Sequence, residues 1–468
     1  MKYFWEKKKF FLLFIFLYLV YIFSLFSGPV VSDDKQIEYN TRNIHLPYGL
    51  GFSVGSDAGN YMRLANNPQL LFEKKRVVKE RELVSGNVGL SRPAMFFVIF
   101  IISKPIDFLV NKFDFVIEKL HSDVKTSLDY GYKISGVEQE IEDSVPMIRD
   151  FYSTYISFFL FNTVLIFFSF SLYCKSIGLS TLSISSYSSF GLWIGLFLII
   201  NDITKKYLIS PSPGIFNLVA ICLTLYACSE LKKNSTNKLK LLAFSLIFGF
   251  GNLFYEVFLI PLGTLYIIYL KIEILDNKQK IFEEIVSSIK YFLISIVFFI
   301  TPYLVWILIA EKFYGGFFHF GLDEFPGFSI LNNDVLTLIK IVTIKSLNSL
   351  WIAFLSLIPL STLIILFSII VIRSKGLGIF KSELFLIPII YSLMTLLFFS
   401  AYGEIRSKHT LCIILGFLPF LNHILTMSSY RKSKFLLFSM IVFFFSYSIF
   451  VARKTFPYGE GIIVNPLL

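Results

Sequence analysis

The sequence predicts an all-α polytopic membrane protein, with about 11 transmembrane helices and a large extracytoplasmic loop after the first of them. Three observations lead to this fold class. Hydrophobic residues make up 55% of the 468 residues and charged residues only 16%, and the mean hydropathy is +0.69. Many apolar runs approach or exceed the roughly 18 residues that a helix needs to cross a bilayer. Finally, lysine and arginine gather in alternate connections between these runs, as the positive-inside rule requires.

The first apolar run, Phe10–Phe26, follows a basic start and lacks a convincing small-residue cleavage site. It therefore predicts an uncleaved helix with a cytoplasmic N-terminus rather than a signal peptide. Ten further spans are expected at 151–173, 183–200, 214–228, 241–256, 258–270, 291–310, 348–372, 383–400, 410–427 and 435–451. The pair 241–256 and 258–270 is short, which leaves a tight hairpin or a broken helix open. Segment 334–350 is amphipathic, and its placement is also open.

The apolar piece Ala94–Val110 is marginal as a span because it contains Lys104, Pro105 and Asp107. If it does not cross, most of the Lys and Arg residues outside the first outer loop fall in the cytoplasmic connections, and fewer fall in the later outer connections and the tail. If it crosses, every later loop is inverted and this bias reverses, against the positive-inside rule. We therefore expect Ala94–Val110 to lie along the membrane surface as an interfacial helix.

This topology makes residues 1–468 a single integral membrane domain. Residues 27–150 then form an extracytoplasmic loop with juxtamembrane helices, and residues 311–347 form a second one. The net charge of +11 needs no nucleic-acid partner, because the cytoplasmic loops of membrane proteins are rich in Lys and Arg.

Within the first outer loop, the polar stretch Gly55–Ala65 contains an acid followed four residues later by a tyrosine. Ser56 or Asp57 can cap a short helix, on which Tyr61, Leu64 and Ala65 would share one face. On the local pattern alone, Asp57 is simply a helix cap.

Other unusual polar residues also fall on the predicted outer side. Arg92 stands in Ser91-Arg92-Pro93-Ala94, Glu256 ends a span, and Arg406 and Lys408 occupy the short turn 402–409. Because ionisable groups at membrane depth are costly, they indicate functional sites. For the 402–409 turn, anchoring at the membrane surface is the alternative to phosphate binding.

Several other features favour structural roles. His319, Asp323 and Glu324 are too loosely spaced to indicate a metal site and fit a solvated loop. Gly191 and Gly195 are spaced for close helix packing. The four cysteines, none with metal-ligand spacing, fit packing roles: Cys174, Cys222, Cys228 and Cys412. The sequence contains no phosphate-binding loop, nucleophile elbow or paired-histidine zinc helix.

Taken together, the layout resembles the GT-C superfamily of membrane glycosyltransferases, which use sugars linked to polyprenyl phosphate. The resemblance rests on short motifs: Asp57 to Tyr61 leading into Arg63–Ala65, Ser91–Ala94 before a surface helix, Gly249-Phe250-Gly251 leading to Glu256, and Arg406 in a late outer turn. The acidic stretch 114–150 is longer than the family pattern, which leaves the substrate class open. No second acidic residue stands directly beside Asp57.

The resemblance implies a glycosyltransferase that moves a sugar from a polyprenyl-phosphate donor to a glycan, lipid or protein acceptor of the cell envelope, with inversion. Asp57 would be the catalytic base. The substrate-binding residues would be Tyr61, Arg92, Glu256, Arg406 and Lys408. No cofactor is identified, and a divalent cation is left open. The expected location is the bacterial inner membrane, with an extracytoplasmic active site surrounded by membrane lipid.

Two other functions remain as alternatives. A polysaccharide polymerase or ligase shares the lipid-linked donor, but these enzymes usually place their large arginine-bearing outer loop late in the chain. A transporter of lipid-linked glycans would show charges at mid-span and inverted repeats, whereas here the predicted spans are almost free of charge. A purely structural membrane protein would not need Asp57 and Arg92 in one outer loop.

Overall fold

The computed structural model describes residues 43–46, 50–53, 64–68, 92–110, 144–178, 194–199, 211–232, 237–276, 281–314, 382–401 and 407–427, with isolated positions such as 61, 191, 201, 204 and 207. The chain divides into two compact units. The first consists of Met1–Val164, Ile200–Ile215 and Val442–Leu468, and the second of Leu165–Ile199 and Phe216–Ile441.

The described part of the chain has the helices expected of a helical membrane protein, as predicted. Five helices are long and apolar enough to cross a membrane: Pro93–Val110, Ser153–Ser176, Pro213–Lys232, Glu256–Ile274 and Ile285–Ile309. The predicted spans Phe10–Phe26, 348–372 and 435–451 lie largely outside the described residues, so the total of 11 stays a prediction. An unpredicted feature is an antiparallel pair of strands, β1 (Asn43–Leu46) and β2 (Leu50–Ser53), with Asn43 opposite Ser53.

In the first unit, helix α5 (Pro93–Val110) matches the apolar piece expected to be helical. Proline suits the first helical position, because its missing N–H would lack an intrahelical partner there anyway. One face of α5 is buried, and it comprises Pro93, Met95, Phe96, Ile99, Ser103 and Ile106. Ile101 and Phe108 instead expose 67% and 63% of their surface. The outward face of the helix therefore carries large apolar residues beside the exposed Lys104.

The connection before α10 is packed against the first half of α7 (Ser144–Ser176). The side-chain amide of Asn162 on α7 donates a hydrogen bond to the backbone carbonyl of Tyr207 at 2.7 Å. Asn201 donates to the Thr204 hydroxyl at 3.0 Å, and both residues are fully buried. A buried polar group in apolar surroundings must find a partner within the protein. The Asn162 and Asn201 amides therefore satisfy the Tyr207 carbonyl and the Thr204 hydroxyl.

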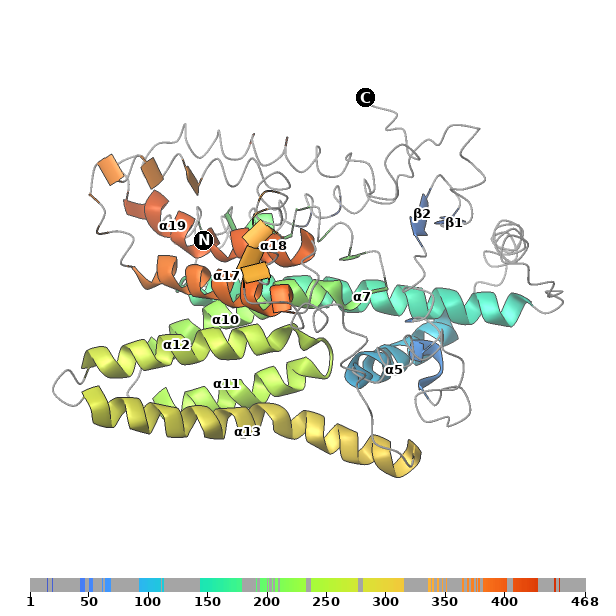
Figure 1. Cartoon of the computed structure of the whole chain (residues 1–468). Coiled ribbons are helices and arrows are strands. Elements are labelled where there is room, and N and C mark those ends of the chain that lie inside the picture. The colour runs from blue at the N-terminus through green and yellow to red at the C-terminus, as the bar shows by residue number, and fades with distance from the viewer. Residues whose placement is uncertain are drawn as a thin grey trace, which may run out of the picture. The chain divides into compact units, whose positions relative to one another are not determined.

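The second unit is a helical bundle formed by α10 (Phe216–Lys232), α11 (Asn237–Asn252), α12 (Leu259–Asp276), α13 (Ile281–Tyr314) and α17 (Glu383–Ala401). Helix α11 packs against α12 and α13, and α12 also packs against α10 and α17 (Figure 1). A short turn and the 3-10 helix η7 (Glu256–Phe258) join α11 to α12. Of the two alternatives for 241–270, the structure therefore has the tight hairpin.

Within the predicted span 410–427 the chain forms two consecutive helices, α18 (Ser407–Gly416) and α19 (Leu418–Met427), so the helix there is broken and the span itself stays a prediction. The break lies at Phe417, whose N–H turns to the Ile414 carbonyl at 3.0 Å. Pro419 explains the break, since it lacks an N–H and its ring would clash with the carbonyl four residues earlier. The predicted span 183–200 likewise ends irregularly, in the 3-10 helix η5 (Leu196–Leu198).

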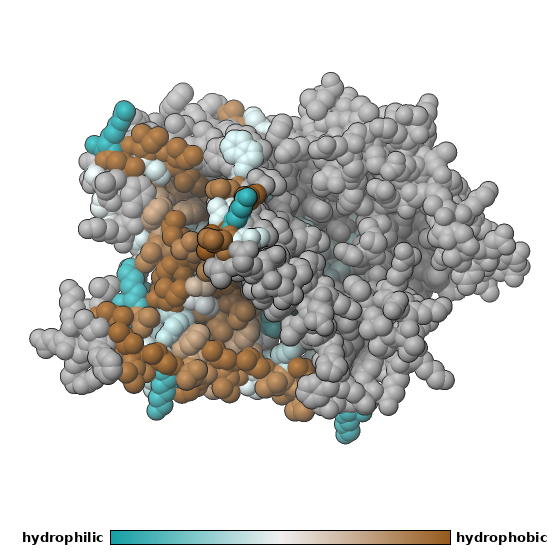
Figure 2. All heavy atoms as spheres, viewed as in Figure 1, coloured by the Kyte–Doolittle hydropathy of each residue, from teal (hydrophilic) through white to brown (hydrophobic). Residues whose placement is uncertain are grey.

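Helix α13 presents a continuous apolar face to its surroundings (Figure 2). Exposed residues recur every three or four positions along it: Val286, Ile289, Leu293, Val297, Ile300, Leu304 and Leu308. Val297 and Leu308 expose 62% and 65% of their surface. Such a face would be unfavourable in water, and it fits a helix that contacts lipid.

The close approach of α11 and α13 gives a test of the fold. A Cβ atom added at Gly249 would lie 2.3 Å from the backbone oxygen of Phe299, whereas one added at Gly378 would meet nothing within 4 Å. Backbone cannot yield as a flexible side chain can, so we expect Gly249→Ala to lose about 1–3 kcal/mol of stability. Gly378→Ala is the control and should change little. Equal thermal unfolding of the two detergent-solubilised variants would contradict this packing.

Candidate substrate site

The short helix that follows the Asp57 stretch folds as its pattern predicts. Tyr61, Leu64 and Ala65 expose 7%, 9% and 0% of their surface, and residues 61 and 64–66 are helical. The three predicted residues therefore share one buried face. Asp57 itself lies outside the described residues, so its assignment as the catalytic base stays a prediction.

Two of the predicted substrate-binding residues, Tyr61 and Arg92, meet although 31 positions separate them in sequence. The Nη1 atom of Arg92 donates a hydrogen bond to the Tyr61 hydroxyl. The guanidinium carbon lies 6.0 Å from the centroid of the Tyr61 ring. That ring stacks on Phe96 of α5, with centroids 5.8 Å apart and planes 20° apart. Arg92 is half-buried, and the phenol fixes its position.

The local sequence explains this arrangement. Arg92 immediately precedes the first residue of α5, and Phe96 comes one helical turn later on the buried face. Phe96, fully buried, holds the Tyr61 ring, and the Tyr61 hydroxyl in turn orients the guanidinium. A fixed guanidinium is suited to bidentate recognition of carboxylate or phosphate, because its donors form a rigid planar fork. Sequence reasoning missed Phe96, whose only signal is its helical spacing from Pro93.

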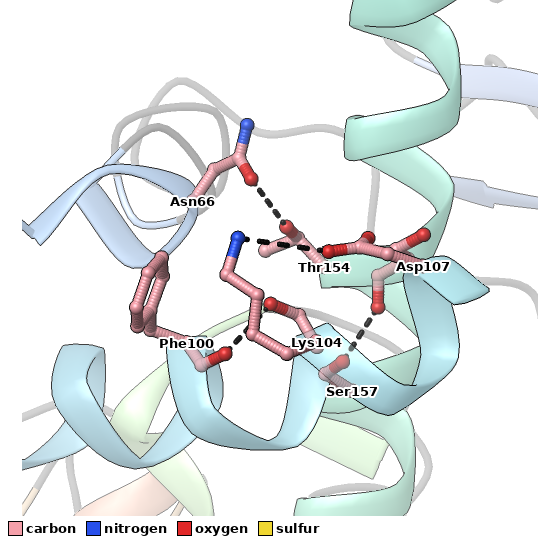
Figure 3. Close-up of polar contacts among 8 residues, drawn as sticks. Asn66, Phe100, Lys104, Asp107, Thr154 and Ser157 are labelled. Carbon is pink, nitrogen blue, oxygen red and sulfur yellow. Dashed lines mark hydrogen bonds and ion pairs between the residues drawn. The ribbon is translucent and has the colours of Figure 1, made fainter.

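A second polar group of the first unit lies farther along α5 and on α7 (Figure 3). The Thr154 hydroxyl donates to the Asn66 side-chain oxygen at 3.5 Å. On α5, Lys104 Nζ lies 3.7 Å from Asp107 Oδ2 and 4.3 Å from the centroid of the Phe100 ring. In the sequence, Lys104 and Asp107 stand out only as charges within a marginal span, and no local pattern singles out Asn66 or Thr154.

In the second unit, Glu256 is the first residue of η7, at the tip of the α11–α12 hairpin. Its side chain is half-buried and interacts electrostatically with Tyr303 of α13. The glycines before it are accounted for by packing, because a Cβ at Gly251 would lie 2.8 Å from the Phe258 ring. Glu256 is therefore a partly exposed carboxylate at a helix junction, which is compatible with the predicted substrate contact.

The late turn is described only in part. Lys408 lies in the first turn of α18, while Arg406 falls outside the described residues. His409 is buried, with 4% of its surface exposed, and its ring stacks on Phe399 of α17 with centroids 3.5 Å apart. That burial is incompatible with a surface anchor at His409. The stacked pair ties the start of α18 to the end of α17, on either side of the segment that contains Arg406.

The residues assigned to packing behave as expected. All four cysteines are free and buried. A Cβ at Gly195 would lie 2.7 Å from the Phe170 and Tyr173 rings, and the Tyr173 hydroxyl donates to the Gly191 carbonyl at 3.1 Å. Within the described part of the chain, no three His, Cys, Asp or Glu side chains form a group able to hold a metal ion. His319, Asp323 and Glu324 lie outside it.

Comparisons with known proteins add no relative. No protein-family model matches the sequence, no curated protein is significantly similar to it, and no solved structure matches its fold.

The Arg92–Tyr61 contact can be measured by a double-mutant cycle. Tyr61→Phe removes the hydroxyl but keeps the stack on Phe96, and Arg92→Met removes the charge but keeps the length of the side chain. We expect the two changes to be coupled by about 1.5–3 kcal/mol in the free energy of unfolding, as for a hydrogen bond to a charged group. In the control cycle, Lys112→Met replaces Arg92→Met and should be additive with Tyr61→Phe. Additivity in both cycles would show that the contact contributes nothing.

Proposed function

We propose that this chain is a membrane glycosyltransferase of the GT-C type. It would transfer a sugar from a polyprenyl-phosphate donor to an acceptor of the cell envelope, on the extracytoplasmic side of the inner membrane. The Arg92–Tyr61 contact carries the proposal. It supports the idea that two elements of the predicted first outer loop, the Asp57–Tyr61 stretch and the Arg92-Pro93 element, act as one site.

The reaction proposed is a single displacement. The acceptor hydroxyl oxygen attacks the anomeric carbon of the donor sugar, and Asp57 takes the hydroxyl proton. The bond between the anomeric carbon and the phosphate oxygen breaks, so that polyprenyl phosphate leaves with the bonding electron pair and the anomeric centre is inverted. A carboxylate at the edge of an apolar membrane protein is suited to this role, because partial desolvation raises its basicity.

The leaving phosphate requires positive charge close to the site of bond cleavage. Arg406 is our first choice for this role, with Arg92 and Lys408 as further phosphate contacts and Glu256 as a contact to the sugar or the acceptor. The fixed guanidinium of Arg92 supports its part, because an arginine already oriented by Tyr61 loses less freedom when it binds phosphate.

We further propose that α5 lies along the outer membrane surface. By length and composition it is also able to cross a membrane, so the distribution of Lys and Arg among the loops decides the orientation. Its side-chain pairs support a surface position: Lys104 lies over Phe100, and Lys112 lies over Phe108 with 4.5 Å from Nζ to the ring centroid. Aromatic rings with an adjacent cation favour the interface between headgroups and acyl chains.

Replacement of Asp57 tests the catalytic base. Asp57→Asn keeps the shape of the side chain and removes its basicity, so we expect transfer to fall by about 10²–10⁴-fold while folding is retained. The assay offers a panel of polyprenyl-phosphate sugars and a crude acceptor lipid extract to purified protein in nanodiscs. Equal turnover by wild type and variant would still support a glycosyltransferase, but it would show that another residue is the catalytic base, with Glu256 the first candidate. If well-folded wild-type protein transfers no sugar from any donor in the panel, even with divalent ions added, a polymerase or a transporter would be favoured.

Replacement of Arg406 tests the phosphate contact. Arg406→Lys keeps the charge but loses the bidentate fork, so we expect at least a tenfold loss of transfer if the guanidinium binds the leaving phosphate. Arg453→Lys, in the predicted outer tail, is the matched control and should leave turnover unchanged. Similar small effects of both substitutions would assign Arg406 to membrane anchoring. The measurement is the initial rate with the donor found active in the same panel.

A further inference from the structure

Lysines gather at one end of the helical bundle in the second unit. The chain reverses direction at each connection from α10 to α13, so the end of α10 and the starts of α11 and α13 lie at the same end (Figure 1). Lysines of α7, α10, α11 and α13 stand there: Lys175, Lys232, Lys238, Lys240 and Lys290. Each of them stands just outside a predicted span, on the predicted cytoplasmic side. We call this set the basic end of the second unit.

Two of these lysines connect α10 to its neighbours. Lys175 Nζ of α7 lies 5.7 Å from the centroid of the Tyr226 ring on α10. One turn later on α10, the Glu230 carbonyl accepts a hydrogen bond from Lys240 of α11, and the Glu230 carboxylate lies 3.8 Å from Lys240 Nζ. The basic end is therefore one continuous surface from α7 to α11, and within it Glu230 offsets the charge of Lys240.

Lys238 contacts an aromatic ring instead of an acid. Its Nζ atom lies 4.9 Å from the centroid of the Tyr291 ring on α13, which is a favourable distance for a cation over a ring. The ring has no net charge, so this contact positions the ammonium group and leaves its positive charge in place. Lys290 immediately precedes Tyr291 and is exposed. Glu284, the acidic residue of α13 closest to Lys290 in sequence, stands roughly 9 Å away along the helix axis.

Exposed apolar side chains accompany these charges. Leu239, next to Lys238 on α11, exposes 70% of its surface. On α13, Ile289 and Leu293 expose 48% and 58%, and they belong to the apolar face that continues along the helix. A phospholipid has the same two parts, a charged phosphate at headgroup level and acyl chains directly beside it. A soluble anion would use only the lysines and leave the apolar side chains without a partner.

We propose that the basic end of the second unit binds an anionic phospholipid. Lys238 and Lys290 contact the headgroup phosphate, and one acyl chain follows the apolar face of α13 past Leu293. A zwitterionic lipid fits less well, because its own cationic group offsets the phosphate that attracts the lysines. The lipid is not the sugar donor: the site belongs to the second unit and to the predicted cytoplasmic side, and the proposal does not depend on glycosyl transfer.

The test is the thermal stability of the full chain in detergent, followed by tryptophan fluorescence while phosphatidylglycerol or phosphatidylcholine is added. We expect phosphatidylglycerol to raise the Tm in a saturable way and phosphatidylcholine to change it little. Lys238→Gln and Lys290→Gln should each weaken the apparent affinity for phosphatidylglycerol about fivefold, the equivalent of about 1 kcal/mol for one lysine near an anionic lipid surface. Lys238→Arg keeps the charge and should bind as wild type does. Lys312→Gln, exposed in the last turn of α13, is the matched control and should also bind normally.

Three results would overturn the site. The first is an equal effect of the two lipids on the wild-type protein. The second is an affinity for phosphatidylglycerol that is the same in Lys290→Gln as in wild type, or that falls as much in Lys312→Gln. Lys290 is exposed, so its variant answers the question even if Lys238→Gln does not fold. The third is full stabilisation by soluble glycerol 1-phosphate, which would assign the lysines to a soluble phosphate and contradict the role of the apolar face.

Discussion

The structure depends on one constraint, namely that a polar group inside so apolar a chain must find its partner within the protein. The backbone carbonyl of Tyr207 is satisfied by the Asn162 amide, and Asn201 and Thr204 satisfy each other. The hydroxyls of Ser157, Thr163 and Ser169 return to their own helix. The same constraint makes a charged side chain in this part of the protein informative. Arg92 is half-buried and engages Tyr61, so a charge that is expensive to bury is kept at one defined place.

That constraint connects the fold to the proposed chemistry. A lipid-linked donor brings a phosphate to the edge of an apolar protein, where an attractive charge acts at low dielectric and is strong. A flexible cation would lose much side-chain freedom on binding, whereas a guanidinium fixed by a phenol and a stacked Phe96 has lost part of it already. In the proposed reaction the Tyr61–Phe96 stack would therefore contribute to both packing and phosphate binding, since the Tyr61 ring packs on the buried face of α5 and its hydroxyl contacts Arg92.

Sequence reasoning predicted the parts of this structure that follow from regular patterns. The helical class, the buried face of Tyr61, Leu64 and Ala65, the helix at 94–110 and the packing role of Gly195 all come from periodicity or residue size. The break at Phe417 was not predicted, because the surrounding run of apolar residues indicates one continuous helix and does not show where Pro419 interrupts it. The Asn66–Thr154 contact was also out of reach, because 88 positions separate the two residues and no local pattern records such a pairing.

The structure also changes how the motifs behind the GT-C resemblance should be weighed. Gly249 and Gly251 are both required by close contacts, with the Phe299 backbone and the Phe258 ring, so helix packing accounts for them without any substrate. His409 is likewise accounted for by its stack on Phe399. Arg92 differs from these residues, because its half-buried guanidinium, bonded to Tyr61, keeps charged donors suited to phosphate directly before a proline-initiated helix. The proposed function therefore rests on the predicted first outer loop, where Arg92 meets the helix that follows Asp57.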